Sequence, residues 1–182
     1  ELSEEEEVED RAEMTLTIDS LRTMLTPSEE GDGFGRHYYD ALQREPDVVL
    51  AHGWGMHSGV WENVAETLID DYRVTVVDLP GHGYSRGFGA GLTLPVLAET
   101  VAAAVPAPAV WVGWSLGGLV AQQAALTMPE RVNRLALVNS TACFTQRPDW
   151  PHAVALPVLR RFADELRENH RAVLKRFVAL EV

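Results

Sequence analysis

The sequence predicts an α/β fold, a mostly parallel sheet with helices on both of its faces. Four short apolar runs, typical of buried parallel strands, lie at 48–51, 74–78, 109–113 and 134–139. Helical patterns separate these runs near 60–70, 94–104 and 117–127. Strands that alternate with helices along a chain pair in parallel, because each helix returns the chain across a face of the sheet.

The first 36 residues differ in composition from the rest. The stretch from Glu1 to Glu13 has eight acidic residues and one arginine, and so contributes −7 to the net charge of −12. Such a run resists burial, so we expect 1–36 to be an acidic tail and linker, disordered or loosely helical, with a short helix at 16–25. We expect 37–143 to form the N-terminal part of the α/β core, beginning with a strand or hairpin near 37–42. Residues 144–182 then begin a helical cap.

The first predicted strand runs directly into His52-Gly53-Trp54-Gly55. In serine hydrolases of this architecture, a histidine-glycine loop after a strand supplies a backbone N–H that stabilises a negatively charged oxygen. We therefore predict the amide of Trp54 as one such donor. The side chain of His52 is expected to be packed and hydrogen-bonded. A plain glycine turn is the alternative interpretation of this segment.

The second predicted strand ends in a turn that begins with Asp78-Leu79-Pro80-Gly81 and closes at Ser85. Its glycines allow unusual backbone angles, and its proline stops the strand. We expect Asp78 and Ser85 to fix the loop and to take no part in chemistry.

The third predicted strand is followed at once by Gly113-Trp114-Ser115-Leu116-Gly117 and then by a helix. This G-x-S-x-G sequence between a strand and a helix is the pattern of the nucleophile elbow, which lifts a serine hydroxyl above the sheet. We predict Ser115 as the nucleophile and the amide of Leu116 as the second oxyanion donor. The pentapeptide alone also fits an ordinary glycine-rich turn, and the two upstream segments favour the catalytic interpretation.

Five segments together resemble the α/β-hydrolases. They are His52–Gly55, Asp78–Gly81, Arg86–Ala90, Gly113–Val120 and Arg176–Leu180. Within that superfamily they are similar to the carboxylesterases that hydrolyse the methyl ester of pimeloyl-[acyl-carrier protein] in biotin biosynthesis. The resemblance runs from about His37 to Val182, roughly four-fifths of the chain. It implies a serine esterase that works through an acyl-enzyme, with acyl carrier protein as its partner.

The resemblance also implies roles in substrate and partner binding. Aromatic residues suited to a linear acyl chain are Trp54, Trp114, Phe144 and Phe177. Basic residues expected to dock the acidic carrier protein are Arg171, Lys175 and Arg176. Arg160, Arg167, Arg171 and Lys175 recur at intervals of seven, four and four, which predicts one basic face. An ordinary solvated helix is the alternative interpretation of that face.

Apolar residues recur on another face of the same stretch and predict a buried stripe. They are Leu159, Phe162, Leu166, Val173, Leu174 and Phe177. We expect Trp111 to be packed in the core of the sheet, and Cys143 to be a small core residue, because free cysteine is usually buried.

An enzyme of this architecture also needs an acid and a histidine base, in the chain order Ser, Asp or Glu, His. The histidines after Ser115 are His152, in a loop, and His170, in a charged helical stretch. The resemblance places both partners on loops after later strands. We therefore expect this sequence to be a C-terminally truncated and catalytically impaired piece of a longer protein, with an open, apolar sheet edge.

Other function classes find little support in the sequence. No cluster of Cys and His has the spacing of a metal site, no loop resembles a phosphate cradle, and no apolar run could span a bilayer. We expect a cytoplasmic monomer without metal, cofactor, nucleic acid or membrane partner. Two alternatives stay open: a general esterase or lipase for another small ester, and a catalytically incompetent binding module.

Overall fold

The computed structural model describes residues 47–88 and 91–181. The predictions for the acidic tail, for the helix at 16–25 and for a strand near 37–42 lie outside these residues. The chain divides into two compact units, one up to Ser140 and one from Thr141 onward. We call the described residues 47–140 the core unit and 141–181 the cap unit.

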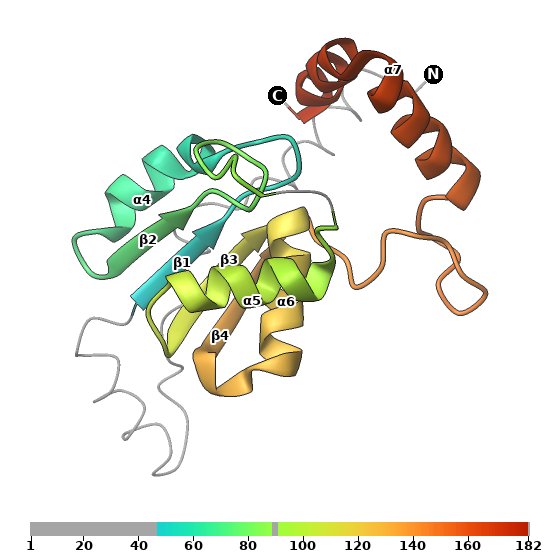
Figure 1. The fold of residues 1–182 in the computed structure, drawn as a ribbon. Helices are drawn as coiled ribbons and strands as arrows, with labels where there is room; N and C mark the ends of the chain where they lie inside the picture. The colour runs from blue at the N-terminus through green and yellow to red at the C-terminus, as the bar shows by residue number, and fades with distance from the viewer. Residues whose placement is uncertain (1–46, 89–90, 182) are drawn as a thin grey trace, which may run out of the picture. The chain divides into compact units, whose positions relative to one another are not determined.

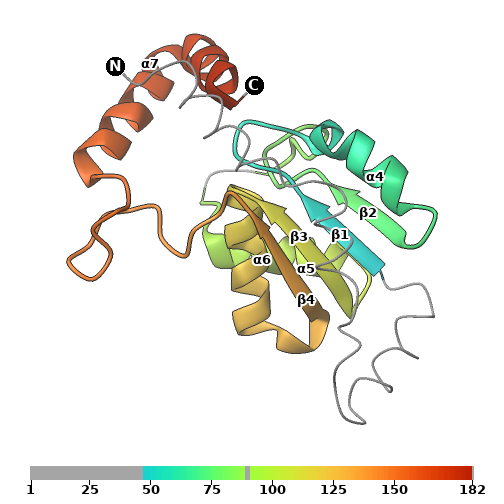
Figure 2. The same ribbon diagram turned by 180° about the vertical axis from the view of Figure 1, so that it is seen from behind.

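The core unit contains a four-stranded parallel sheet in the order β2-β1-β3-β4 (Figure 1, Figure 2). The strands are β1 (Asp47–Ala51), β2 (Arg73–Val77), β3 (Ala109–Trp114) and β4 (Val132–Val138). All three pairings are parallel, and Val49 of β1 faces Thr75 of β2 and Trp111 of β3. The predicted α/β fold with a parallel sheet is therefore confirmed.

Helices cover both faces of this sheet, as Figure 1 shows. The 3-10 turn η1 (Ser58–Trp61) and helix α4 (Glu62–Leu68) lie on one face, where Leu68 packs with Val48 and Leu50. Helices α5 (Leu94–Ala104) and α6 (Leu116–Thr127) lie on the other face with Val49 and Ala51. Alternate residues of β1 thus enter opposite cores, and the whole strand is buried.

Strand β4 lies at one edge of the sheet and directly follows the 3-10 turn η2 (Pro129–Arg131). Its Leu135 and Leu137 side chains are exposed to 37% and 40%. Within the described residues, β4 pairs with a strand on one side only, and the predicted open apolar edge stays a prediction. Trp111, by contrast, is fully buried at the centre of the sheet, as predicted.

The cap unit begins with a loop and ends in α7 (Leu156–Glu181), which is bent in Figure 1. Asn169 has non-helical backbone angles (φ −151°, ψ 73°), so two helical arms meet there. Its side-chain oxygen accepts a hydrogen bond of 3.2 Å from the N–H of Ala172 and so caps the second arm. The two arms fold back on each other, as the short distance between the rings of Phe162 and Phe177 shows: their centroids lie 6.1 Å apart.

Three predictions about the cap unit need correction. A single basic face from Arg160 to Lys175 assumed one continuous helix, and the bend at Asn169 puts the first two of its members on one arm and the last two on the other. Cys143 is not a core residue: its side chain is half-exposed, and the thiol donates to the carbonyl oxygen of Thr145 at 3.2 Å. The apolar stripe is only partly buried, with Val173 its most enclosed member.

Among the described helices, none combines the length and the apolar composition required to cross a bilayer. No three metal-ligating side chains come together in residues 47–88 and 91–181.

Candidate active site

Ser115 is the single residue between the end of β3 and the start of α6. Its backbone angles (φ 52°, ψ −112°) are rare for any residue other than glycine and are strained. Strand β4 and the residues just after it hold Ser115 in place. The N–H of Ser115 donates to Val138 O at 2.9 Å, and the Ser140 hydroxyl donates to Ser115 O at 2.8 Å. This is the geometry expected of a nucleophile elbow.

Two glycines make this turn possible. A Cβ atom on Gly117 would lie 2.2 Å from the backbone oxygen of Ala51, at the end of β1. A Cβ atom on Gly113 would lie 2.5 Å from the backbone of Gly117. Both contacts are far closer than real Cβ atoms tolerate, and the opposing atoms are backbone. The first turn of α6 can therefore approach the sheet only because these positions lack side chains.

The side chain of Ser115 is half-buried, and its hydroxyl has no hydrogen-bond partner within the described part of the chain. Leu116 is the first residue of α6. The first amides of a helix have no partner inside the helix and carry the positive end of its dipole. The Leu116 N–H therefore sits where a negatively charged oxygen beside Ser115 would be favoured.

The loop after β1 lies next to this serine. A Cβ atom on Gly53 would lie 3.4 Å from the Cβ of Ser115 and 3.5 Å from the ring of Trp114. The loop turns back through a hydrogen bond of 3.3 Å from the N–H of Met56 to Gly53 O, with Gly55 at φ +72°. Two segments about 60 positions apart in the sequence thus lie side by side. The prediction that the amides of Trp54 and Leu116 donate to one oxyanion requires this proximity.

His52 is completely buried beneath that loop. Its Nδ1 lies 2.7 Å from Gly53 O, and its Nε2 lies 3.0 Å from the backbone nitrogen of Leu79. Burial lowers the pKa of the imidazole below its ordinary value, although the bond to Gly53 acts in the opposite direction. The prediction of a packed, hydrogen-bonded His52 is confirmed, and backbone groups occupy both of its ring nitrogens.

Asp78 ties the turn after β2 to the loop after β1. Its carboxylate accepts hydrogen bonds from the N–H groups of Ser58 at 2.6 Å and Tyr84 at 2.8 Å. Burial acts to raise the pKa of Asp78, but these backbone bonds outweigh it and hold the pKa below its ordinary value. Ser85 closes the same turn by accepting from the N–H of Gly81 at 2.7 Å. Asp78 and Ser85 thus hold this loop through hydrogen bonds, as the sequence predicts.

The aromatic side chains assigned to the substrate are distributed over both units. Trp54 and Trp114 are half-buried in the core unit. Trp114 packs against the hydrophobic cluster between α4 and the sheet, which includes Leu68. Phe144 and Phe177 belong to the cap unit. The four side chains thus belong to two separate compact units, and the predicted ring of aromatic residues around Ser115 stays a prediction.

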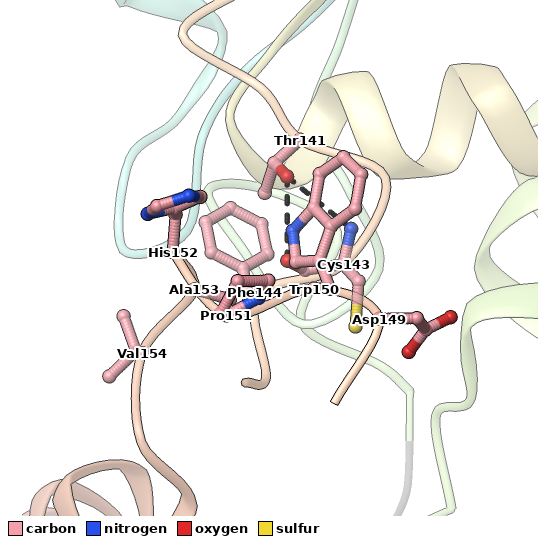
Figure 3. Close-up of a pocket in the computed structure, with 9 residues that line it drawn as sticks. All are labelled: Thr141, Cys143, Phe144, Asp149, Trp150, Pro151, His152, Ala153 and Val154. Atoms are coloured by element: carbon pink, nitrogen blue, oxygen red, sulfur yellow. Dashed lines mark hydrogen bonds between the residues drawn. The ribbon is translucent and has the colours of Figure 1, made fainter. Parts of the chain in front are cut away.

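The cap unit contains a cavity of about 510 Å³ (Figure 3). Its walls are formed by Thr141, Cys143, Phe144, Asp149, Trp150, Pro151, His152, Ala153 and Val154. The loop closes on itself through backbone bonds, from Val154 N–H to Phe144 O at 3.0 Å and from Gln146 N–H to Val154 O at 2.9 Å. The sequence predicted only Phe144 here, because the other lining residues share no periodic spacing that could have revealed them.

The residues assigned to carrier docking are all exposed on the second arm of α7. Arg176 already has a partner, since its guanidinium donates to Glu165 at 2.6 Å. Arg161 donates to the other oxygen of Glu165 at 2.9 Å. The hydrogen bonds from these two arginines lower the pKa of Glu165, and the bond from Arg161 has the larger effect. His152 and His170 are exposed, as expected of solvated positions.

Comparison with known proteins agrees with this geometry. The sequence profile of the family described as alpha/beta hydrolase fold matches residues 46–181. A pimeloyl-[acyl-carrier protein] methyl ester esterase of Xylella fastidiosa is 46% identical over 144 residues, which cover 79% of this chain and 56% of that protein. One of Stenotrophomonas maltophilia is 46% identical over 145 residues, with 80% and 55% covered. The chain thus spans about half the length of these curated relatives.

Solved structures support the fold assignment. An enol-lactonase from Burkholderia xenovorans is similar with a TM-score of 0.63 and 26% identity, over 74% of this chain and 50% of the other. A thermophilic esterase from Thermogutta terrifontis is similar with a TM-score of 0.61 and 28% identity, over 75% and 48%.

Proposed function

Since the chain belongs to the α/β-hydrolase family, we propose that it is the nucleophile-bearing part of a serine carboxylesterase that hydrolyses the methyl ester of pimeloyl-acyl carrier protein. The observation that carries the esterase chemistry is the strained Ser115 at the head of α6, with the Gly53 loop beside it. The substrate follows from the relatives, which are 44–46% identical to this chain and named for that ester.

In the proposed reaction, the Ser115 hydroxyl attacks the ester carbonyl carbon and passes its proton to a general base. The amides of Trp54 and Leu116 donate hydrogen bonds to the oxyanion of the tetrahedral intermediate. The intermediate collapses, and methanol leaves with the proton that the base returns. Water then attacks the acyl-serine and releases the free pimeloyl acid, still attached to its carrier, and the original Ser115.

The base needs a ring nitrogen that can exchange a proton with Ser115. His52 does not suit this role, because backbone groups occupy both of its nitrogens. We assign the base to a histidine, and its carboxylate partner, in the portion of the relatives that this chain does not match.

The partner and substrate contacts belong to the same proposal. Arg171, Lys175 and Arg176 would meet the acidic carrier protein, since opposite charge favours encounter. Trp54, Trp114, Phe144 and Phe177 would line the path of the acyl chain. The proposal includes a cytoplasmic monomer in biotin biosynthesis that uses no metal or cofactor, with 37–143 as core and 144–182 as cap.

The nucleophile assignment is tested with Ser115→Ala in the complete gene product that contains this sequence. Hydrolysis of short p-nitrophenyl esters should fall by about 10⁶-fold in kcat, the loss seen when a triad serine is removed. Ser85→Ala is the matched control, because only the backbone of Ser85 holds its turn, and it should keep wild-type kcat. Retained activity in Ser115→Ala would refute the assignment.

A general esterase for other small esters is the second candidate, since the similar structures include an esterase and a lactonase. Lys175→Glu separates the two candidates. It should lower kcat/KM for carrier-bound pimeloyl methyl ester and leave a free short ester unaffected. Equal effects on both substrates would favour the general esterase.

A further inference from the structure

His52 connects the loops that follow two neighbouring strands, β1 and β2. Its ring is fully buried, and each nitrogen faces one backbone group, Gly53 O on one side and the N–H of Leu79 on the other. The ring of His82 is a further neighbour, 5.2 Å away between centroids and tilted by 62°. Both nitrogens of this fully buried ring are therefore satisfied, and the ring bridges the two loops.

The two partners fix the tautomer of this ring. A backbone N–H can only donate, so the Nε2 facing Leu79 must be the acceptor, without a proton. The neutral ring then carries its proton on Nδ1, which donates to the carbonyl oxygen of Gly53 at 2.7 Å. Burial favours this neutral form, because a charged imidazolium would lose its hydration.

The carbonyl of Gly53 and the N–H of Trp54 belong to the same peptide group. That group is planar and trans, so its C=O and N–H point in opposite directions. A hydrogen bond that fixes the direction of the carbonyl therefore also fixes the direction of the N–H. The Met56 N–H bonds the same carbonyl at a longer 3.3 Å, and the Gly53 backbone lies against Ser115.

We propose that His52 is a positioning residue, which directs the Trp54 N–H toward the oxyanion by holding the carbonyl of the Gly53–Trp54 peptide group. It touches no reacting atom and acts only through this peptide. The inference rests on the proposed function, because it assumes that Trp54 donates to the oxyanion. Oxyanion donors are effective when they are oriented before the reaction begins, and a buried neutral imidazole provides that orientation.

Two substitutions separate the two hydrogen bonds. In His52→Asn, the side-chain NH₂ can replace Nδ1 as the donor to Gly53, but the acceptor for Leu79 is lost. In His52→Gln, the side-chain oxygen can replace Nε2 as the acceptor for Leu79, but the donor to Gly53 is lost. Each variant gives up one buried hydrogen bond, so the two form a matched pair.

The expected result is a difference in kcat on p-nitrophenyl esters, measured in the complete gene product. His52→Gln should lower kcat by about 10- to 100-fold with KM nearly unchanged, because loss of an oxyanion donor costs at most about 10²–10³-fold. His52→Asn should keep most of the wild-type kcat. His82→Gln, which removes the neighbouring ring without touching Gly53, serves as control. Equal kcat in the Asn and Gln variants would overturn the proposal.

NMR provides a readout that does not depend on activity or on the variants folding. The ¹⁵N shifts of the wild-type imidazole should show a proton on Nδ1 and none on Nε2 across neutral pH, and the opposite tautomer would refute the inference. In folded His52→Gln, the Trp54 amide resonance should move while that of Leu116 stays. If the wild-type protein hydrolyses no ester, the proposed function fails, and these shifts still decide whether His52 holds the peptide.

Discussion

The core unit and the cap unit hold their candidate functional residues by different means. In the core unit, Ser115 is fixed by hydrogen bonds of its own backbone and by the close approaches that Gly113 and Gly117 allow. The loop after β1 is fixed by the buried ring of His52 and by the carboxylate of Asp78. In the cap unit, Arg176 and Phe177 are held by other side chains, Glu165 and Phe162. The core contacts involve backbone or buried groups with few rotatable bonds, whereas the ion pair of Arg176 depends on a long, exposed side chain.

This difference matches the tasks that we propose for each unit. Transition-state stabilisation needs donors fixed to within a fraction of an ångström, and backbone amides in a rigid turn supply that. Recognition of a charged partner works through long-range attraction and tolerates mobile side chains. Changes in the core unit should therefore have large effects on folding and chemistry, and changes in the cap unit small effects on stability.

The largest effect is expected from Gly117→Ala. The new Cβ would meet the backbone oxygen of Ala51 at 2.2 Å, so either α6 or β1 must move. We expect a loss of about 3 kcal/mol or more in the free energy of unfolding, measured by urea denaturation. Gly87→Ala is the matched control, since nothing lies within 4 Å of its Cβ position. If both variants were equally mild, the core would not be held by close backbone contact.

The second effect is a pH dependence that originates at His52. Burial lowers the pKa of His52 in the folded state below the ordinary 6.5 of the unfolded chain. At a pH between the folded-state pKa and 6.5, His52 is therefore protonated in the unfolded chain and neutral in the folded protein. Stability is therefore lost as the pH falls below 6.5, by at most about 1.4 kcal/mol per pH unit from this one group. The His82 and His57 charges act to lower this pKa further, and Asp78 acts to raise it.

Urea denaturation at pH values from about 5 to 8 measures this dependence. His52→Gln should flatten the curve in that range, because glutamine does not titrate. An unchanged slope in the variant would show that other groups cause the loss of stability.

The core unit was largely predictable from the sequence. All four strands were located to within two residues, and α5 has the predicted bounds, because a buried parallel strand is a continuous apolar run and a helix pattern separates each pair. The contact between the Gly53 loop and Ser115 follows from placing both at the carboxyl ends of adjacent strands. The bond from Leu79 to His52 was not predictable, since it joins residues 27 positions apart through one side chain.

The cap unit was predicted less well. The spacing of its arginines suggests a straight helix, whereas Asn169 ends one arm and caps the next. An asparagine inside a charged helical stretch is the signal that could have revealed the bend, because its side chain competes for backbone hydrogen bonds. The exposure of Cys143 depends on how its loop closes, which composition does not determine.

The third prediction concerns that bend. Asn169→Ala removes the acceptor for the N–H of Ala172 and should destabilise the second arm of α7 by about 1 kcal/mol. Hydrogen exchange should accelerate at the first amides after 169 and stay unchanged in α5. Asn169→Asp, which keeps an acceptor, is the control. Slower exchange in the alanine variant would mean that the arms join into one helix and that Asn169 imposes the bend at a cost.

The smallest effect is expected from Glu165→Gln, which removes the charge that pairs Arg161 and Arg176. Both arginines are largely exposed, so water and salt already screen these ion pairs. The midpoint of thermal unfolding should stay within experimental error of the wild-type value, and any shift should vanish in 1 M NaCl (Debye length about 3 Å). Glu168→Gln, an exposed neighbour on the same arm, controls for the change in net charge. A large, salt-independent loss would mean that the cap is held as firmly as the core. A negligible loss would mean that Arg176 can exchange Glu165 for an acidic partner at little cost, as a docking residue must.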